Sequence, residues 1–361
     1  MTSPALTISD SLTITGQTGG MSSDLLRDAE SGLDLSGARP FAIAMTERFR
    51  GLTVREGMLL HGPAGWGEFC PFDDYDDQSS TSWLEAAIEA ATAGWPEPVR
   101  DRIPINVTVP AVGPERAHEI VRASGCRTAK IKVADHPGSG TEDVARVEAV
   151  RDALGPDGAI RVDANMLWDV DTAVTRIREL DRAAAGLQYV EQPCRTIEEL
   201  AAVRRRVDVR IAADESIRRA EDPMRVAVAG AADIAVIKCT PLGGVRRALR
   251  VAAAAGLPCV ISSALETSVG LAAQLALAGA LPELDFACGL GTRSLLRGDV
   301  VAAADSLIPV DGFLPVPRTP PAPDLELLAE HRISDPAREQ WWRDRLARTW
   351  ELRQARLRAG C

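Results

Sequence analysis

Five short stretches of the chain end an apolar run in charged residues, and each could supply a side chain to one chemical site. Lysine amines and carboxylates can move protons or hold a metal ion. The charged residues recur at intervals of roughly 23 to 31 residues, which is long enough for one strand, one helix and two loops. The stretches are Lys130-Ile-Lys132, Val162-Asp163-Ala-Asn165, Val190-Glu191-Gln-Pro193, Ala213-Asp214-Glu-Ser216 and Val236-Ile-Lys238.

The segments around these stretches alternate between apolar runs and helix-patterned runs, which is typical of a parallel sheet covered by helices. Strands are predicted at 103–109, 128–133, 159–164, 187–192, 209–214, 233–239, 258–263 and 286–289. Helices are predicted at 114–124, 141–153, 170–183, 196–206, 222–229, 243–255 and 268–279. This pattern predicts an α/β fold, a (β/α)7β TIM-type barrel over residues 101–290, with its site at the carboxyl ends of the strands.

The flanking segments predict a smaller α+β capping domain. Residues 38–100 contain short strands and one helix, and we expect residues 291–361 to return to them. His61–Glu68 is dense in glycine and is interpreted as a loop. The final helix, which begins at Pro336, presents an aromatic face that should dock it on the cap. Residues 1–37 are rich in Ser, Thr, Gly and Asp, and we expect a poorly ordered extension.

Composition excludes several classes of protein. The chain of 361 residues carries 41 basic and 51 acidic side chains, a net charge of −10, and no sustained basic stripe. Nucleic acid is therefore not an expected partner. No apolar run reaches the roughly 18 residues that a membrane span requires. Seven scattered cysteines favour a reducing cytoplasm. The expected partner is a small carboxylic acid substrate, and nothing implies an obligate protein partner.

Asp163, Glu191 and Asp214 end three consecutive predicted strands, so their carboxylates should be neighbours. Grouped carboxylates repel one another and take up protons unless a cation lies between them. An all-oxygen set of this kind suits Mg²⁺, with Mn²⁺ able to substitute. The alternative is that the three acids are structural ion-pair partners of the nearby lysines.

The lysines flank the predicted metal site. Lys130 and Lys132 lie two apart on one strand and point to the same side. Each cation should lower the pKa of the other, which would make an amine into a base near neutral pH. Lys238 is about four strands away, so it should approach from the opposite side. Lys132 and Lys238 are the candidate catalytic residues.

Six further residues are candidates for substrate contacts or for supporting the catalytic groups. Ser262, Ser263 and Glu266 follow the seventh strand and could hold the distal part of a ligand, although a serine there could equally cap a helix. The other three are Lys130, Asn165 and Arg50.

The five motifs at these spacings resemble the enolase superfamily, in the muconate-lactonizing-enzyme-like subgroup that has lysines on both faces of its site. Further segments resemble the o-succinylbenzoate synthase family in its actinobacterial form, over about residues 38–320. These segments are Arg48-Phe-Arg-Gly51, Arg55-Glu-Gly57, Gly62-Pro-Ala-Gly-Trp-Gly-Glu-Phe69, Pro71-Phe72 and Ser262-Ser-Ala-Leu-Glu-Thr-Ser-Val-Gly270.

This resemblance implies a reaction and a role for each residue. Asp163, Glu191 and Asp214 would bind Mg²⁺, and Lys132 would remove the proton alpha to the carboxylate of 2-succinyl-6-hydroxy-2,4-cyclohexadiene-1-carboxylate. The same group would then protonate the leaving hydroxide, a syn dehydration that yields 2-succinylbenzoate for menaquinone biosynthesis. Lys238 would stabilise the enediolate. Cap loops near 48–50 and 65–68 would close on the substrate.

Three other functions fit the same residues. An N-acylamino acid or N-succinylamino acid racemase would use Lys132 and Lys238 both as acid and as base. A Schiff-base aldolase would use Lys238 as its nucleophile, although three nearby carboxylates would keep that amine charged. A non-catalytic metal-binding barrel would bind magnesium without turnover.

Overall fold

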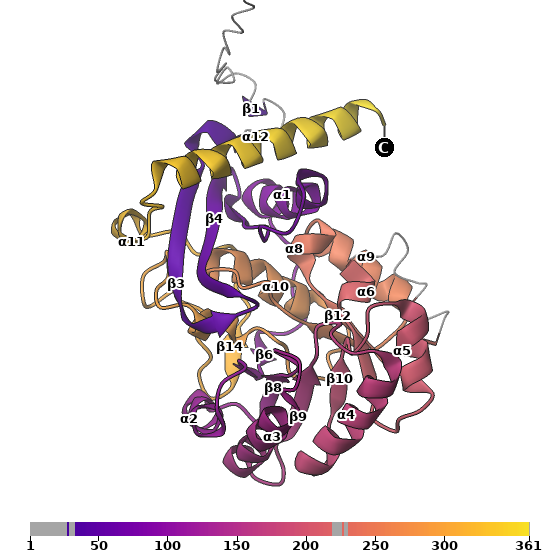
Figure 1. Ribbon diagram of the computed structural model, residues 1–361. Coiled ribbons are helices and arrows are strands. Elements are labelled where there is room, and N and C mark those ends of the chain that lie inside the picture. Colours follow the sequence, from indigo (N-terminus) through magenta and orange to yellow (C-terminus); the bar gives the residue numbers. More distant parts are fainter. Residues whose placement is uncertain (1–26, 29–32, 219–225, 227–229, 361) are drawn as a thin grey trace, which may run out of the picture.

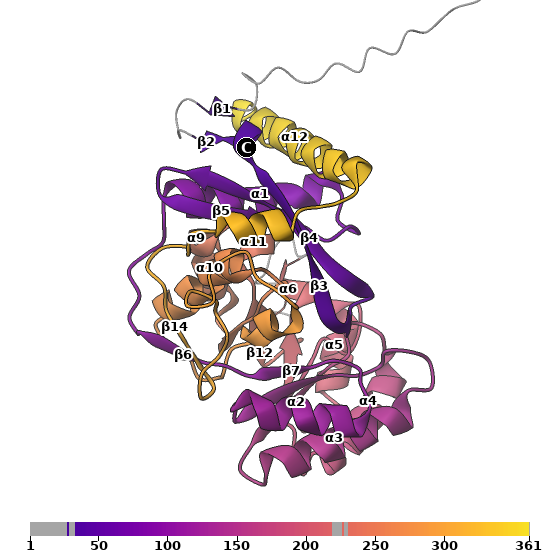
Figure 2. The ribbon, with the colours of Figure 1, turned by 90° about the vertical axis from the view of Figure 1, so that its left-hand side faces the viewer.

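The computed structural model describes residues 27–28, 33–218, 226 and 230–360. Figures 1 and 2 show a barrel of strands and helices with a smaller domain above it, and the first and last described segments lie together on that smaller domain. Each domain has its own cluster of buried apolar side chains. No helix among the described residues is long and apolar enough to span a membrane. The predicted fold class, a TIM-type barrel with an α+β cap, is confirmed.

Seven parallel strands form the barrel sheet in chain order, and an eighth segment closes it. The strands are β7 (Val107–Val109), β8 (Thr128–Lys132), β9 (Ala159–Asp163), β10 (Tyr189–Glu191), β11 (Ile211–Ala213), β12 (Ile234–Ile237) and β13 (Cys259–Ile261). Single parallel bridges join Cys288 to Ile105 and Gly289 to Ser262. The predicted strand at 286–289 therefore closes the barrel through bridges alone.

The predicted strand 103–109 is in fact two strands with different partners. β6 (Arg102–Pro104) pairs antiparallel with β14 (Phe313–Pro315), and only β7 joins the barrel. The main chain changes partner between them, because Ile105 N donates to Gly312 O and Asn106 N donates to Cys288 O. Pro104 has no amide hydrogen with which to continue a ladder, which suits it to this junction.

Helices cover the outside of the sheet, and most neighbouring helices in the chain contact one another. The helix predicted at 243–255 begins at Val245, because Gly243 and Gly244 both have positive φ and separate it from a short helix at 239–242. The predicted helix 222–229 lies outside the described residues except for Val226, which is buried. The helices are α2 (Pro114–Ser124), α3 (Gly140–Leu154), α4 (Val170–Ala183), α5 (Ile197–Arg204), α6 (Glu215–Arg218), α8 (Cys239–Leu242), α9 (Val245–Ala255) and α10 (Ser268–Ala280).

The cap is built on a long hairpin that reaches down to the barrel (Figure 1). β3 (Arg39–Phe49) and β4 (Leu52–Gly62) pair antiparallel, and β5 (Gly65–Phe69) adds a third strand. The predicted loop at 61–68 is therefore mostly strand. Helix α1 (Asp77–Thr92) lies so close to β5 that a Cβ on Gly67 would collide with the main chain at Ala87. The glycines of this segment thus permit close packing rather than a loop.

Both ends of the chain return to the cap. Helix α12 (Pro336–Arg358) contacts α1, and Trp342, Leu346 and Trp350 are buried as the aromatic face predicts. Between the barrel and α12 lie the 3-10 turn η3 (Gly291–Leu295) and α11 (Leu325–Glu330), while Leu307 and Leu314 pack into the barrel core.

The poorly ordered extension predicted at residues 1–37 is too long, because its last residues belong to the cap. β1 (Arg27–Asp28) pairs with β2 (Leu33–Asp34), the turn η2 (Leu35–Gly37) follows, and both leucines are buried in the cap core. Two leucines in a polar segment were enough to dock it. Residues 1–26 lie outside the described residues.

Candidate active site

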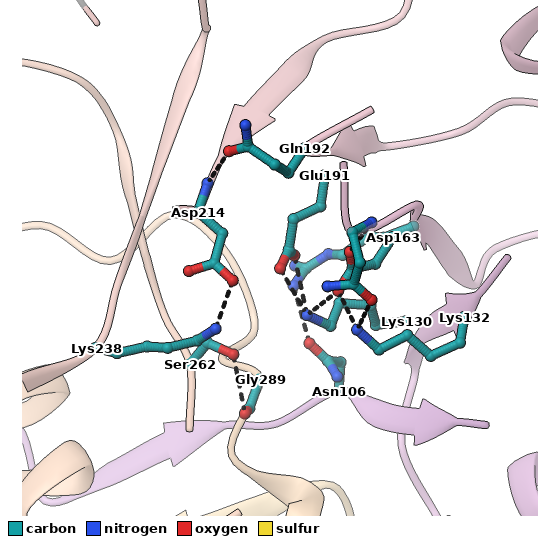
Figure 3. Close-up of polar contacts among 12 residues, drawn as sticks. Asn106, Lys130, Lys132, Asp163, Glu191, Gln192, Asp214, Lys238, Ser262 and Gly289 are labelled. Carbon is teal, nitrogen blue, oxygen red and sulfur yellow. Dashed lines mark hydrogen bonds and ion pairs between the residues drawn. The ribbon is translucent and has the colours of Figure 1, made fainter. Parts of the chain in front are cut away.

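The three predicted acids lie together at the carboxyl ends of consecutive strands. Asp163 and Glu191 are paired in register as the last residues of β9 and β10, and Asp214 follows β11 directly. All three side chains are almost fully buried. Figure 3 shows Glu191 between Asp214 on one side and Asp163 on the other. The parallel register forces this arrangement, because strand ends meet at one edge of the sheet.

The three lysines form ion pairs with these acids. Lys130 Nζ lies 2.8 Å from Glu191 Oε1 and 3.1 Å from Asp163 Oδ2, and Lys132 Nζ lies 2.5 Å from Asp163 Oδ2. Lys238 Nζ lies 2.5 Å from Asp214 Oδ2, across the mouth from Lys132 (Figure 3). The structure therefore brings both candidate catalytic lysines to opposite sides of one carboxylate cluster.

The two lysines of β8 differ in their pKa values. Burial lowers the pKa of Lys132, the Asp163 charge opposes this shift, and the Lys130 and Arg50 cations add to it. Burial also disfavours the charged form of Lys130, but the Glu191 and Asp163 carboxylates outweigh it and raise that pKa. Lys130 lowers the pKa of Lys132, as predicted, whereas the net pKa shift of Lys130 itself is upwards. Lys132 is the amine suited to accept a proton.

The acids differ in the same way. Burial and the neighbouring Asp163 charge raise the pKa of Glu191 to about 7. Burial also acts to raise the pKa of Asp163, but the Lys132 and Lys130 cations bring it well below its usual range. The raised pKa of Glu191 shows that its neighbours disfavour its charged form, which a further cation beside it would favour.

A small cavity opens between the ion pairs and the cap. The tip of the β3–β4 hairpin covers it through Phe49 and Arg50, and the Phe49 ring centroid is 5.2 Å from Lys132 Nζ. Arg50 also reaches Glu215, the residue after Asp214, at 3.9 Å. The predicted cap contact at 48–50 therefore lies at the mouth. The predicted contact at 65–68 does not, because these residues belong to β5.

The remaining predicted residues divide into two groups. Asn165 Oδ1 accepts from Lys132 Nζ at 2.7 Å, and Ser262 and Ser263 line the cavity. Glu266 does not line it. Its carboxylate accepts from Thr240 Oγ1 at 2.8 Å and from Ala264 N at 2.6 Å, so it braces the loop from outside. Sequence position alone could not distinguish these directions.

Gln192 is a supporting residue that sequence reasoning left without a role. Its Oε1 accepts from the main-chain N of Asp214 at 2.9 Å and of Ser216 at 3.1 Å. This links the end of β10 to the start of the next strand-end turn. Its place beside Glu191 in the Glu-Gln-Pro motif was the available signal, and its backbone has a left-handed φ of 40°.

Comparisons with known proteins identify the family. A model of the "Enolase C-terminal domain-like" family matches residues 114–320, and a model of the "Enolase N-terminal domain-like" family matches residues 41–91. A protein of Thermobifida fusca named o-succinylbenzoate synthase is 62% identical over 309 residues, which are 86% of this chain and 94% of that protein. This chain belongs to the o-succinylbenzoate synthase family of the enolase superfamily. The synthase of Mycolicibacterium smegmatis is 54% identical over 306 residues, 84% of this chain and 92% of that protein.

Solved structures agree on the fold of this o-succinylbenzoate synthase family member. Muconate lactonizing enzyme from Pseudomonas fluorescens, complexed with muconolactone, has a TM-score of 0.69 at 22% identity and covers 82% of this chain and 98% of its own. N-succinyl Arg/Lys racemase from Bacillus cereus has a TM-score of 0.68 at 20% identity, covering 82% and 96%. At such identities these likenesses establish the fold alone. The family membership makes the chain an enzyme.

The donor chemistry at the mouth fits a hard divalent cation. Three buried carboxylates face one another, and burial leaves the pKa of Glu191 raised to about 7 even with Lys130 beside it. Across the described residues, no three Asp, Glu, His or Cys side chains are already gathered closely enough to ligate one ion. The lysines form ion pairs with the acids. These are the contacts expected if the three acids were structural partners of the lysines and not metal ligands.

Proposed function

We propose that this enzyme is a lyase that dehydrates 2-succinyl-6-hydroxy-2,4-cyclohexadiene-1-carboxylate to 2-succinylbenzoate, a step of menaquinone biosynthesis. One observation carries the proposal. Lys132 and Lys238 face one carboxylate cluster from opposite sides, in a chain 62% identical to a protein named for this reaction. A carbon acid held between them would have an amine on each face.

Lys132 is the proposed base. Burial lowers the pKa of Lys132, which favours its neutral form, and Asn165 Oδ1 and Asp163 Oδ2 accept hydrogen bonds from its Nζ at 2.7 and 2.5 Å. Lys132 takes the proton from the carbon alpha to the substrate carboxylate and becomes an ammonium group. That ammonium then gives the proton to the departing hydroxide on the same face. One water leaves, and the ring becomes aromatic, so atoms and charges balance.

Asp163, Glu191 and Asp214 are the proposed ligands of Mg²⁺ or Mn²⁺. When bound, the ion supplies a positive charge to the substrate carboxylate, which lowers the barrier to loss of the neighbouring proton. The chain contributes three oxygen-bearing side chains on rigid strand ends. Gln192 adds order to this set, because it fixes the main chain at Asp214.

Lys238 is proposed to stabilise the charge that develops when the proton leaves. Its Nζ lies 2.5 Å from Asp214 Oδ2 and lines the cavity from the side opposite Lys132. A cation placed in advance at that side favours the transition state over the bound acid. A Schiff-base aldolase would use Lys238 as its nucleophile, and borohydride trapping with a carbonyl substrate in the presence of EDTA tests it; we expect Lys238 to remain unmodified.

The decisive experiment is a spectrophotometric assay of the purified protein. With the cyclohexadiene acid and Mg²⁺, the aromatic product should accumulate, and Lys132→Ala should abolish its formation. Protein without turnover on this acid would refute the proposal. If it also bound magnesium normally, it would be the non-catalytic barrel.

The racemase alternative is tested by isotope exchange. N-succinylamino acids incubated in deuterated water should exchange their alpha hydrogen far more slowly than the acid is dehydrated. Rapid exchange that depended on both Lys132 and Lys238 would favour the racemase, because that reaction needs an acid and a base on opposite faces.

A further inference from the structure

One wall of the active-site cavity is held in a strained conformation from outside the site. Residues 262–265 line the cavity just after β13, the seventh strand of the barrel. Within this wall Leu265 has a φ of 64°, in the left-handed region that a branched side chain rarely adopts. Such a conformation persists only when the surrounding structure fixes it.

Arg55 binds the main chain of this wall, although it belongs to β4 of the cap and is not among the residues that line the cavity. Its Nε donates to Leu265 O at 3.1 Å, and its Nη2 donates to Ala264 O at 3.1 Å. Nη2 also donates to Cys70 O, which ties the wall to the cap strand β5. The guanidinium is 2% exposed and stacks 4.5 Å from the ring centroid of Phe72, another cavity-lining residue.

Glu68 fixes the other end of the same loop from the cap. Its Oε2 accepts from Thr267 Oγ1 at 2.5 Å and from Gly270 N at 3.0 Å, at the first turn of α10. Glu266 accepts from Ala264 N on the barrel side. The loop is therefore bounded by buried charged groups, and Arg55 is the one that binds the carbonyl of the strained residue itself.

We propose that Arg55 is a positioning residue that sets the shape of the wall 262–265. Through this wall it determines how tightly the enzyme holds the succinyl arm of its substrate, the side chain that carries an oxo group and a second carboxylate. The wall stands on the seventh strand, whereas the three acids stand on the third, fourth and fifth strands, across the mouth. A substrate whose ring carboxylate lies at the acids extends its other arm towards this wall. The identity of that arm rests on the proposed function.

A planar guanidinium can donate to several carbonyl oxygens at once, whereas a lysine ammonium cannot reproduce that fork. Arg55→Lys keeps the charge and most of the volume, and should release the wall without creating a large cavity. We expect KM for the cyclohexadiene acid to rise at least about tenfold while kcat changes by less than about threefold. The Mg²⁺ concentration that gives half-maximal activity should not change, because the acids keep their contacts.

Arg100 offers a matched control at the other end of α10. It also donates to main-chain carbonyl oxygens, those of Ala278, Leu281 and Pro282, and none of these three residues lines the cavity. Arg100→Lys should lower thermal stability and leave KM at the wild-type value. If Arg100→Lys raised KM as much as Arg55→Lys, the effect would be general loosening and the proposal would fail.

Hydrogen exchange separates the claim about the wall from the claim about the reaction. In Arg55→Lys, amides of peptides covering 262–267 should exchange at least about tenfold faster, while peptides covering β9 and β10 keep their rates. Unchanged exchange at 262–267, or an unchanged KM, would overturn the role of Arg55. If wild-type protein fails to dehydrate the acid, the proposed function and its substrate arm fall together, and the exchange rates still decide whether Arg55 controls the wall.

Discussion

Replacing Lys130 by methionine should move the acid limb of the pH–rate profile upwards. Lys132 must be neutral to act as a base, so kcat/KM rises as pH increases through its pKa. Lys130 and Lys132 both reach Asp163 Oδ2, at 3.1 and 2.5 Å, so their Nζ atoms are no farther apart than the sum of these distances, about 5.6 Å. Removing the Lys130 charge therefore makes it easier to protonate Lys132.

The magnitude follows from Coulomb's law. Two unit charges about 5.6 Å apart interact by about 3 kcal/mol at an effective dielectric constant of about 20. This free energy is equivalent to about two pH units. Both side chains are well buried, at 8% and 13% exposure, so solvent screens the interaction only weakly.

The assay is kcat/KM for the cyclohexadiene acid across the pH range at saturating Mg²⁺. Lys130→Arg is the matched control, because it keeps the positive charge and should leave the acid limb within a few tenths of a pH unit of wild type. Lys130→Met should shift the limb by about one to two units. A profile for Lys130→Met that coincides with wild type would refute the assignment of Lys132 as a base tuned by its neighbour.

Lys132→Ala should reduce dehydration by at least about 10²- to 10⁴-fold, measured as product formation, and retained Mg²⁺ binding would exclude unfolding as the cause. The affinity of substrate-free protein for Mg²⁺ should rise as pH increases towards about 7 and then level off, because the raised pKa of Glu191 means that binding displaces a proton below that pH. Calorimetry in two buffers of different ionisation enthalpy checks this, and Glu191→Gln should lose the pH dependence. Gly67→Ala should lower the free energy of unfolding by about 1 to 3 kcal/mol or more, since its Cβ would collide with Ala87. Gly37→Ala, which meets nothing within 4 Å, should be nearly neutral in urea unfolding, and equal stabilities would contradict the packing argument.

The order of the barrel followed from local pattern. Helix α2 and helix α4 match their predicted bounds because each has a clear start: Pro114 at the first turn of one, and an Asp169 cap whose side chain accepts from Thr172 N in the other. The charged residues at the strand ends could also be recognised from the sequence. A charged residue after an apolar run is costly to bury without a partner, so its position carries information.

The predictions of element bounds that were wrong concern segments whose hydrogen-bond or packing partners lie far away in the sequence. The strand predicted at 103–109 is two strands because the adjacent amides of residues 105 and 106 donate to different distant partners, the carbonyl oxygens of Gly312 and Cys288. Residues 33–37 belong to the cap and not to the predicted extension, because Leu33 and Leu35 are buried in the cap core. Neither choice is written in the local pattern of apolar residues.

The sequence by itself determined that the acids and lysines of consecutive strand ends meet at the mouth, since strand order and a residue's place at a strand end fix that directly. Only the tertiary structure decided what each one does there. Lys130 and Lys132 are identical and two residues apart, yet their pKa values move in opposite directions because Lys130 contacts two carboxylates and Lys132 contacts one. Arg55 reaches the cavity wall across about 200 residues of chain. Charge and hydrogen bonding act through space, and distance in space is what folding sets.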